Sequence, residues 1–272
     1  MNLFRIIYQN LWKVITLMTL VAFIVYGFLI EPQRVEVTHW ERHVGLAGTT
    51  LNIAQLSDLH ISEIGSTERK TLEHLKLLQP NIILLTGDVI DHSDSLSALN
   101  SFLKELPPSI KIAILGNWEH WSGVDLKALA ALYAENDVTL LVNNCISLSS
   151  IGLRLSIAGF DDYTAGQPDA NQTFLNCGKD DHIIIAEHSP GLFEETPPPE
   201  MPKPAFSLAG HTHGGQLAIG NKAIFTPPGS GRFVSGWYTT LWGDLYVSKG
   251  IGTSVLPLRI GARPEISIFE VN

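Results

Sequence analysis

The sequence predicts an α/β fold built on a parallel sheet, and two observations support this prediction. First, five short apolar runs are rich in Ile, Leu, Val or Ala and contain no internal proline, which is typical of buried strands. Second, polar-apolar stretches of helical period at residues 68–79 and 94–106 separate the first three runs. Strands that alternate with helices along a chain form parallel sheets. The five runs are residues 52–57, 81–87, 111–116, 182–187 and 205–210.

The chain opens with a strongly apolar segment that we expect to cross a membrane. Residues 14–30 carry no charge, and Arg5 and Lys13 precede them. A membrane span needs about 17–25 such residues, so this segment lies at the short end. A cleaved signal peptide and an interfacial helix are competing interpretations, but the run is long for a signal core and lacks a clear small-residue cleavage site. The preceding basic residues favour a cytoplasmic N-terminus and an external globular domain.

The rest of the chain is predicted to form one domain. We place the membrane anchor at residues 1–30 and the domain at residues 31–272, which are enough to close one large core. Residues 31–50 are expected to form an edge strand and a turn. Residues 194–204, of which five of eleven are proline, are expected to form a surface loop.

Each of the five apolar runs ends on side chains that can bind a metal. In open sheets of this kind, ligands bind outside the carboxyl ends of the strands, so we expect these side chains to meet in one crevice. Asp and Asn offer oxygen, His offers neutral nitrogen, and Cys is absent from these motifs. This donor set favours borderline-hard divalent ions. Seven ligands suit two ions, and a carboxylate shared between two cations supports displacement at phosphorus. The seven residues are Asp58, His60, Asp88, Asn117, His188, His211 and His213, with Asp88 as the natural bridge.

The motifs around these residues resemble those of calcineurin-like metallophosphoesterases, in the order of that family, over residues 50–272. The resemblance rests on Asp58-Leu59-His60, Gly87-Asp88, Gly116-Asn117, Glu187-His188 and Gly210-His211-Thr212-His213. It implies a four-layer α/β/β/α sandwich and two divalent metal ions, with manganese, iron and zinc as the candidates. It also implies one ion held by Asp58, His60 and His213, a second held by Asn117, His188 and His211, and Asp88 between them.

The C-terminal sequence is similar to a membrane-associated bacterial branch of that family, in residues 245–254 and 261–266. This branch includes UDP-2,3-diacylglucosamine pyrophosphatases of lipid A synthesis. The likeness implies a single-pass protein of the bacterial inner membrane that cleaves a phosphoester or pyrophosphate bond in an amphipathic lipid or small molecule. A lipid A precursor is met on the cytoplasmic face, whereas the charge bias favours the external face, so the side stays open. The alternatives are a general extracytoplasmic phosphodiesterase and a metal-binding scaffold without turnover.

The sequence departs from the family pattern directly after Asn117. The family usually continues Gly-Asn with a His that protonates the leaving oxygen, whereas here Trp118 follows, and an indole cannot transfer protons. Either His120, two residues further on, takes this role, or the leaving group departs without help. Asn117 and His120 are therefore our catalytic candidates. Asp91 either orients a metal-binding His or, as we favour, caps the following helix.

The charged, sulfur-containing and aromatic residues limit the possible partners and compartment further. The net charge of −9 argues against nucleic acid as a partner, because an acidic body repels phosphate backbones. After the last metal motif, Arg263 and then Lys249 are the candidates for a substrate phosphate, and pairing with surface acids is equally open. Cys145 and Cys177 can pair in an oxidising compartment, but we favour two buried free thiols. The aromatic residues within 225–242 are expected in the core rather than against lipid.

Overall fold

The computed structural model describes residues 3–46, 48–149, 152–179, 181–219 and 222–272, and their order of elements is that of an α/β protein. Two sheets, each of six strands in this part of the chain, pack face to face. The first has the order β1 (Glu36–Arg42), β14 (Glu265–Val271), β2 (Leu51–Leu56), β3 (Ile82–Thr86), β4 (Ile110–Ile114) and β5 (Val138–Leu141). The second has the order β12 (Gly236–Thr240), β13 (Gly243–Val247), β9 (Phe206–Ala209), β8 (His182–Ala186), β7 (Leu155–Gly159) and β6 (Asn144–Ser147).

The five predicted strands are confirmed as β2, β3, β4, β8 and β9, with ends that differ by one or two residues. Neighbouring pairs among β2, β3 and β4 run parallel, as do β8 and β9. The predicted edge strand is β1, which lies at the edge of the first sheet and pairs in parallel with β14. The two predicted helices are α2 (Ser66–Leu78) and α3 (Leu96–Glu105).

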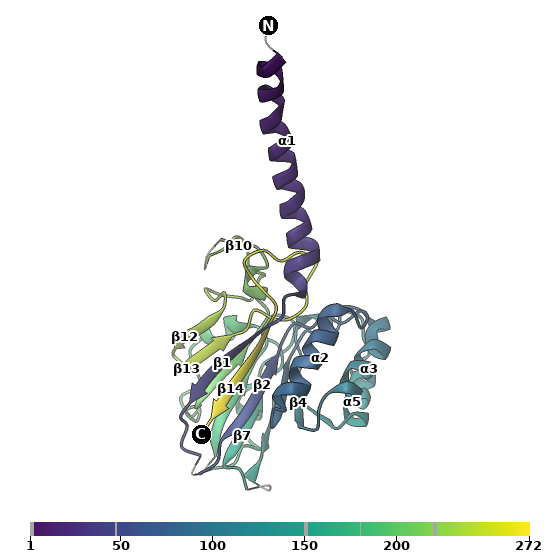
Figure 1. Cartoon of the computed structure of the whole chain (residues 1–272). Helices are drawn as coiled ribbons and strands as arrows, with labels where there is room; N and C mark the ends of the chain where they lie inside the picture. Colours follow the sequence, from purple (N-terminus) through teal and green to yellow (C-terminus); the bar gives the residue numbers. More distant parts are fainter. Residues whose placement is uncertain (1–2, 47, 150–151, 180, 220–221) are drawn as a thin grey trace.

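The alternation of side chains along each strand separates two apolar cores. Along β3, Ile83 and Leu85 pack against α2, α3 and α5 (Leu126–Glu135), while Ile82 and Leu84 face the second sheet. Both faces of this strand are therefore covered, which explains its continuous apolar sequence. Figure 1 shows the three helices together on one flank of the sheets.

The outer face of the second sheet has a thinner cover than the expected layer of helices. The short helix α6 (Ala170–Phe174), a 3-10 turn at Pro190–Glu194 and neighbouring loops lie over it. Phe160, Phe193 and Trp242 fill this third core with edge-to-face contacts. The α/β prediction is confirmed, and the fourth layer consists mostly of turns and loops.

The expectation of two free thiols is wrong, because Cys145 and Cys177 form a disulfide. Cys145 lies on β6, and Cys177 follows α6, which packs against β6. The two residues are 32 positions apart, so their proximity depends on a tertiary contact that sequence spacing cannot show.

The N-terminal helix projects from the body of the protein (Figure 1). Helix α1 (Leu3–Val25) continues as one π-helical turn at Tyr26–Ile30. Within this region, Asn10–Gln33 has a mean hydropathy of 2.2 and is 11% buried, so its length and composition suffice to cross a membrane. At its lower end Gly27 packs closely against Leu258 and Ile260 of a C-terminal loop.

Candidate metal centre

The seven predicted ligands are brought together where strands of both sheets end. They follow β2, β3, β4, β8 and β9, and all seven side chains are buried. Parallel neighbours place these strand ends at one edge, so residues up to 155 positions apart in the sequence meet there. In two groups, Asp58 with His60 and His213, and Asp88 with His188 and His211, the potential ligand atoms lie within 4.8 Å of one another.

In the first group, two imidazole nitrogens face each other. His60 Nε2 lies 3.1 Å from His213 Nε2, which lies 3.3 Å from Asp58 Oδ1. His60 Nδ1 donates to Asp91 Oδ1 at 2.6 Å, so Nε2 is the nitrogen that can bind a metal once it has released its proton. Burial, and then the charges of His60 and Arg259, lower the pKa of His213 well below its ordinary value, so its imidazole is neutral. A neutral imidazole is the form that binds metals.

The contact with His60 also shows what Asp91 does. Its carboxylate orients the imidazole, while the 3-10 turn at Ser93–Ser95 and α3 have no side-chain cap. Our preference for Asp91 as a helix cap is wrong. The carboxylate is 24% exposed, whereas the His60 ring is buried, and the hydrogen bond to a buried ring outweighs a solvated cap.

The second group contains a buried nitrogen without a hydrogen-bond partner. His188 Nδ1 donates to the Thr86 carbonyl at 2.7 Å, so Nε2 is the nitrogen that holds either a proton or a metal. Nε2 has no hydrogen bond in the described structure and lies 3.1 Å from Asp88 Oδ2. Burial by itself would lower the pKa of His188, but its contact with Asp88 and the charges of Asp88, Asp58 and Asp162 together outweigh burial and raise the pKa well above the ordinary value. A cation is the partner that this arrangement lacks.

Asn117 extends the second group through His211. Burial, and then the charge of His188, lower the pKa of His211, so its neutral ring has a single N–H. Nε2 donates it to the Pro228 carbonyl at 2.7 Å, which leaves Nδ1 as an acceptor 2.8 Å from another acceptor, Asn117 Oδ1. Two lone pairs that face each other at this distance fit a cation held between them.

Asp88 lies between the two groups. Its Oδ2 atom is 3.1 Å from His188 Nε2 and 3.8 Å from His60 Nε2, while Oδ1 accepts from the Trp118 backbone N–H at 2.8 Å. Ligand bonds of about 2.0–2.2 Å at right angles separate neighbouring ligand atoms by about 3 Å, which matches the distances within both groups. The donor set and its geometry therefore fit two divalent ions that share Asp88.

Five of the seven residues have a backbone conformation that is rare outside glycine. Their φ angles lie between 46° and 70°, in the left-handed region. Each such residue costs about 1–3 kcal/mol unless the surrounding structure enforces it. These turns redirect the chain immediately after a strand, so that consecutive loops converge. The residues are Asp58, His60, Asp88, His211 and His213.

Two glycines permit the close approach of the loops. A Cβ atom at Gly116 would lie 2.4 Å from Asp88 Oδ1, and one at Gly210 would lie 1.8 Å from Ser57 Oγ and 2.6 Å from Asp58 Oδ2. No side chain fits at either position without displacement of a ligand. The glycine of the Gly-Asn and Gly-His motifs is thus a steric requirement of the site.

The comparisons with known proteins agree with this geometry. The family model described as calcineurin-like phosphoesterase matches residues 51–215. The chain belongs to this family. It is 31% identical to the Bacillus subtilis protein named uncharacterized metallophosphoesterase YkuE, over 90% of this chain and 88% of that protein. It is 28% identical to Phosphodiesterase YaeI of Escherichia coli, over 71% of each chain.

A further relative links this family to membranes. The Bos taurus protein named transmembrane protein with metallophosphoesterase domain is 28% identical over 80% of this chain and 52% of its own length. Family membership and the two candidate metal sites make this protein a hydrolase of phosphoric esters. Its donor set is consistent with two divalent metals.

Sequence reasoning missed Glu119, which joins the loops after β3 and β4. Its buried carboxylate accepts backbone N–H bonds from Val89 at 2.7 Å, Asp88 at 2.9 Å and Gly116 at 2.7 Å. Burial, and then the charge of Asp88, raise its pKa. A Glu three positions after the residue that precedes a helix is the signature of a capping box, so the signal was present in Gly116-Asn117-Trp118-Glu119. The bonds to the other loop could not be read from it.

The guanidinium of Arg259 is fully buried. It donates to the carbonyls of Lys249, Gly252 and Ala262 at 2.5–2.9 Å, beside the loop that carries His213. Burial lowers its pKa to about 10. Arg259 therefore ties the C-terminal loop together and is closed to substrate.

The two predicted phosphate contacts lie elsewhere. Lys249 Nζ contacts Glu36 directly and lies 3.9 Å from Glu265, and Arg263 is 3.9 Å from Glu36. Neither residue lines the cavity of about 240 Å³ at the metal centre. The structure favours pairing with acids, and contact with a substrate phosphate stays a prediction for both.

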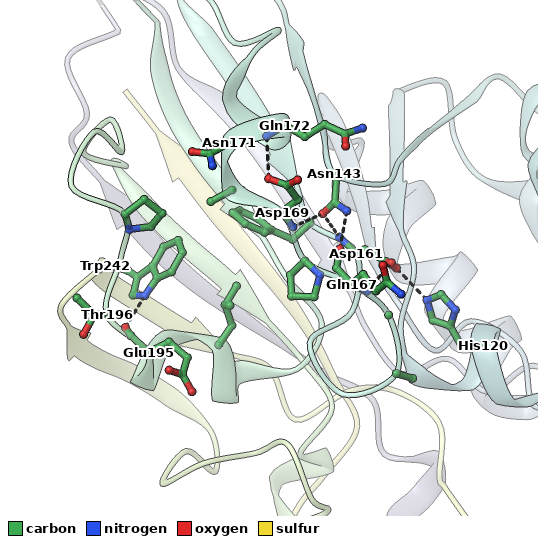
Figure 2. A pocket seen from close by; sticks show the side chains of 17 residues that line it. His120, Asn143, Asp161, Gln167, Asp169, Asn171, Gln172, Glu195, Thr196 and Trp242 are labelled. Carbon is green, nitrogen blue, oxygen red and sulfur yellow. Dashed lines mark hydrogen bonds and ion pairs between the residues drawn. The ribbon is translucent and has the colours of Figure 1, made fainter.

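The candidate proton donor points away from the metal centre. His120 lies on α4 (Asn117–Trp121), and its Nε2 bonds Asp161 Oδ1 at 2.8 Å on the wall of a separate cavity of about 810 Å³. Figure 2 shows this ring turned toward Asp161. Trp118 and Trp121 of the same helix line the metal cavity instead. His120 must leave Asp161 to reach a leaving group, so its catalytic role stays a prediction.

Proposed function

We propose that this hydrolase is a membrane-anchored enzyme that cleaves a phosphoester or pyrophosphate bond in an amphipathic substrate, on the external face of a bacterial inner membrane. The position of Asp88 Oδ2 between the two ligand groups carries the hydrolytic part of the proposal. Two bound divalent ions lower the pKa of a water and neutralise charge on the phosphate. The chain itself fixes the direction of two ligand nitrogens. Asp91 orients the ring of His60, and the Thr86 carbonyl orients the ring of His188.

Three features support the membrane and its external face. The span Asn10–Gln33 is apolar and almost wholly unburied, as a helix that packs only against lipid would be. The Cys145–Cys177 disulfide suits an oxidising compartment, since cytosolic thiols are kept reduced. The basic residues before the span favour the same orientation.

UDP-2,3-diacylglucosamine has the amphipathic chemistry of the proposed substrate but is met on the cytoplasmic face. The disulfide therefore favours another lipid-linked phosphate or pyrophosphate. A reporter enzyme fused after Asn272, active only outside the cytoplasm, tests this: we expect activity. An inactive reporter would place the domain in the cytoplasm and make UDP-2,3-diacylglucosamine the preferred substrate. Nucleic acid stays excluded in the proposal, because the acidic body opposes it.

The variant Asp88→Asn tests the hydrolytic function. We expect manganese-stimulated hydrolysis of bis(p-nitrophenyl) phosphate and p-nitrophenyl phosphate to fall more than about 100-fold, because residues that merely orient ligands already cost about 10–100-fold. Asp94→Asn is the matched control, since Asp94 is exposed in the same loop. Equal turnover of both variants would contradict a shared carboxylate.

The role of His120 requires a comparison of leaving groups. If His120 protonates the leaving oxygen, His120→Gln should lose about 10²–10⁴-fold on an alkyl phosphate ester and far less on a p-nitrophenyl ester, whose leaving group departs without a proton. A structural role through Asp161 would lower both rates alike. Equal losses on the two esters would therefore reject proton donation.

A further inference from the structure

The metal centre opens onto an apolar surface. Its cavity of about 240 Å³ adjoins a second cavity of about 300 Å³, since both are lined by His213, Phe225, Pro227, Ser254 and Val255. Among the residues that the structure describes, no Asp, Glu, Lys or Arg side chain lines the second cavity. A phosphate at the metal centre thus has an apolar space beside it, which suits a substrate that carries a hydrocarbon chain.

Exposed hydrophobic side chains surround this opening. We call Ile224, Phe225, Val255 and Leu256 the apolar rim; they are 67%, 67%, 89% and 54% exposed. Of the aromatic residues within 225–242, Phe225 belongs to this rim, while Phe233 and Trp242 are buried in the core as expected. A contiguous exposed apolar patch beside a cavity marks an interaction site.

Val255 gives an independent sign of function. It is a β-branched residue with φ of 63°, a conformation that strongly favours glycine or asparagine. Its side chain is the most exposed of the large hydrophobic residues in the described chain. The strained backbone and the exposed side chain together fit a partner outside the protein, and an external apolar phase matches this side chain.

The rim lies at the same end of the protein as the membrane helix. The loop that carries Val255 and Leu256 continues to Arg259, whose backbone N–H bonds the Gly27 carbonyl at 3.0 Å, and Leu258 packs on Gly27. Figure 1 shows β10 (Ala218–Ile219), which precedes Ile224, beside the base of α1. The rim therefore faces the surface of the bilayer from which α1 emerges.

We propose that the apolar rim inserts into the membrane that holds α1, and that the apolar cavity receives a hydrocarbon chain of a lipid phosphate bound at the metal centre. This inference rests on the anchoring of α1 in the proposed function. It adds the orientation of the active site toward the bilayer and a chain-binding subsite next to His213.

Site-specific labels in the full chain test the rim. The native cysteines pair with each other, so a nitrobenzoxadiazole dye labels an introduced thiol at Leu256→Cys, at Leu20→Cys in α1, or at Leu77→Cys. Leu77 is the matched control, because it is 83% exposed and lies at the C-terminal end of α2. The N-terminal end of α2 is the one near the membrane helix, since Thr67 contacts Pro32 there. Each variant is placed as a single copy in nanodiscs of phosphatidylcholine and phosphatidylglycerol with doxyl-labelled lipid.

We expect loss of emission at positions 20 and 256 and none at 77. Loss at 20 without loss at 256 overturns the rim proposal and leaves the anchor standing. No loss at 20 overturns both. A label at 256 that becomes shielded only when two copies share a disc assigns the rim to self-association and also overturns the proposal.

A kinetic comparison tests the chain-binding subsite. The double variant Ile224→Gln, Leu256→Gln should lower the ratio of kcat/KM for a dioleoyl over a dihexanoyl phosphate ester of the same head group by about tenfold or more, since the long chain loses contact with two apolar side chains that line the second cavity. Leu77→Gln should leave the ratio unchanged. An unchanged ratio in the double variant would overturn the chain-binding subsite. Absence of all turnover in the native chain, including on bis(p-nitrophenyl) phosphate, would overturn the proposed function instead.

Discussion

The substitution Glu119→Gln isolates the contribution of one buried carboxylate to the metal centre. Glu119 Oε2 accepts from Asp88 and Gly116, and Oε1 accepts from Val89. Gln retains one carbonyl oxygen and places an NH₂ group against the remaining N–H. The variant therefore leaves one buried donor unsatisfied and weakens two charge-assisted bonds.

The expected loss of stability follows from these contacts. An unsatisfied buried donor costs about 1–3 kcal/mol, and weaker bonds to the other two N–H groups add to it, so we expect about 2–4 kcal/mol in the free energy of unfolding. For a domain of this size each kcal/mol shifts Tm by about 2–4 °C, which predicts a drop of roughly 4–16 °C. The manganese affinity should fall about 10–100-fold, because the Asp88 backbone loses its fixed position.

Thermal unfolding of the full chain in detergent at pH 8, followed by circular dichroism, measures the first effect, and manganese titration measures the second. Glu105→Gln is the matched control: Glu105 pairs with Lys76 at 3.1 Å, and both side chains are about half exposed. A surface pair of this kind contributes about 0–1 kcal/mol. If Glu119→Gln unfolds within the range of this control and binds manganese normally, the three backbone bonds do not hold the site.

Two further predictions concern the disulfide and the pH dependence of metal binding. Replacing both Cys145 and Cys177 by Ser should lower the free energy of unfolding by about 3–4 kcal/mol, because the bond closes a loop across a 32-residue separation. Urea denaturation of the native chain and the variant, with and without reductant, measures this loss. A midpoint of the native chain that does not change with reductant would contradict the disulfide. Because Asp88 and the neighbouring carboxylates together outweigh burial and raise the pKa of His188, a proton competes with the metal below that pKa. Manganese affinity should rise with pH by about tenfold per unit for one released proton, as titration at pH 6, 7 and 8 would show, and a flat profile would refute this competition.

Much of the site was visible in the sequence because its ligands stand directly after strands. Apolar runs identify strands locally, and the rule that parallel strands present their carboxyl ends at one edge brings Asp58, Asp88 and His188 together without knowledge of side-chain contacts. The same reasoning could not give the direction of His120, because its position in the motif does not tell on which side of α4 its ring lies. Asp161, 41 positions away, determines that direction.

The order of elements, the apolar span and the candidate metal ligands follow from the amino-acid sequence, because periodicity and motif spacing are local properties. The left-handed turns at five ligands, the Cys145–Cys177 bond, the three bonds of Glu119 and the rim beside α1 arise from packing between segments far apart in the chain. Such contacts depend on which loops two sheets bring together. No local pattern encodes that geometry.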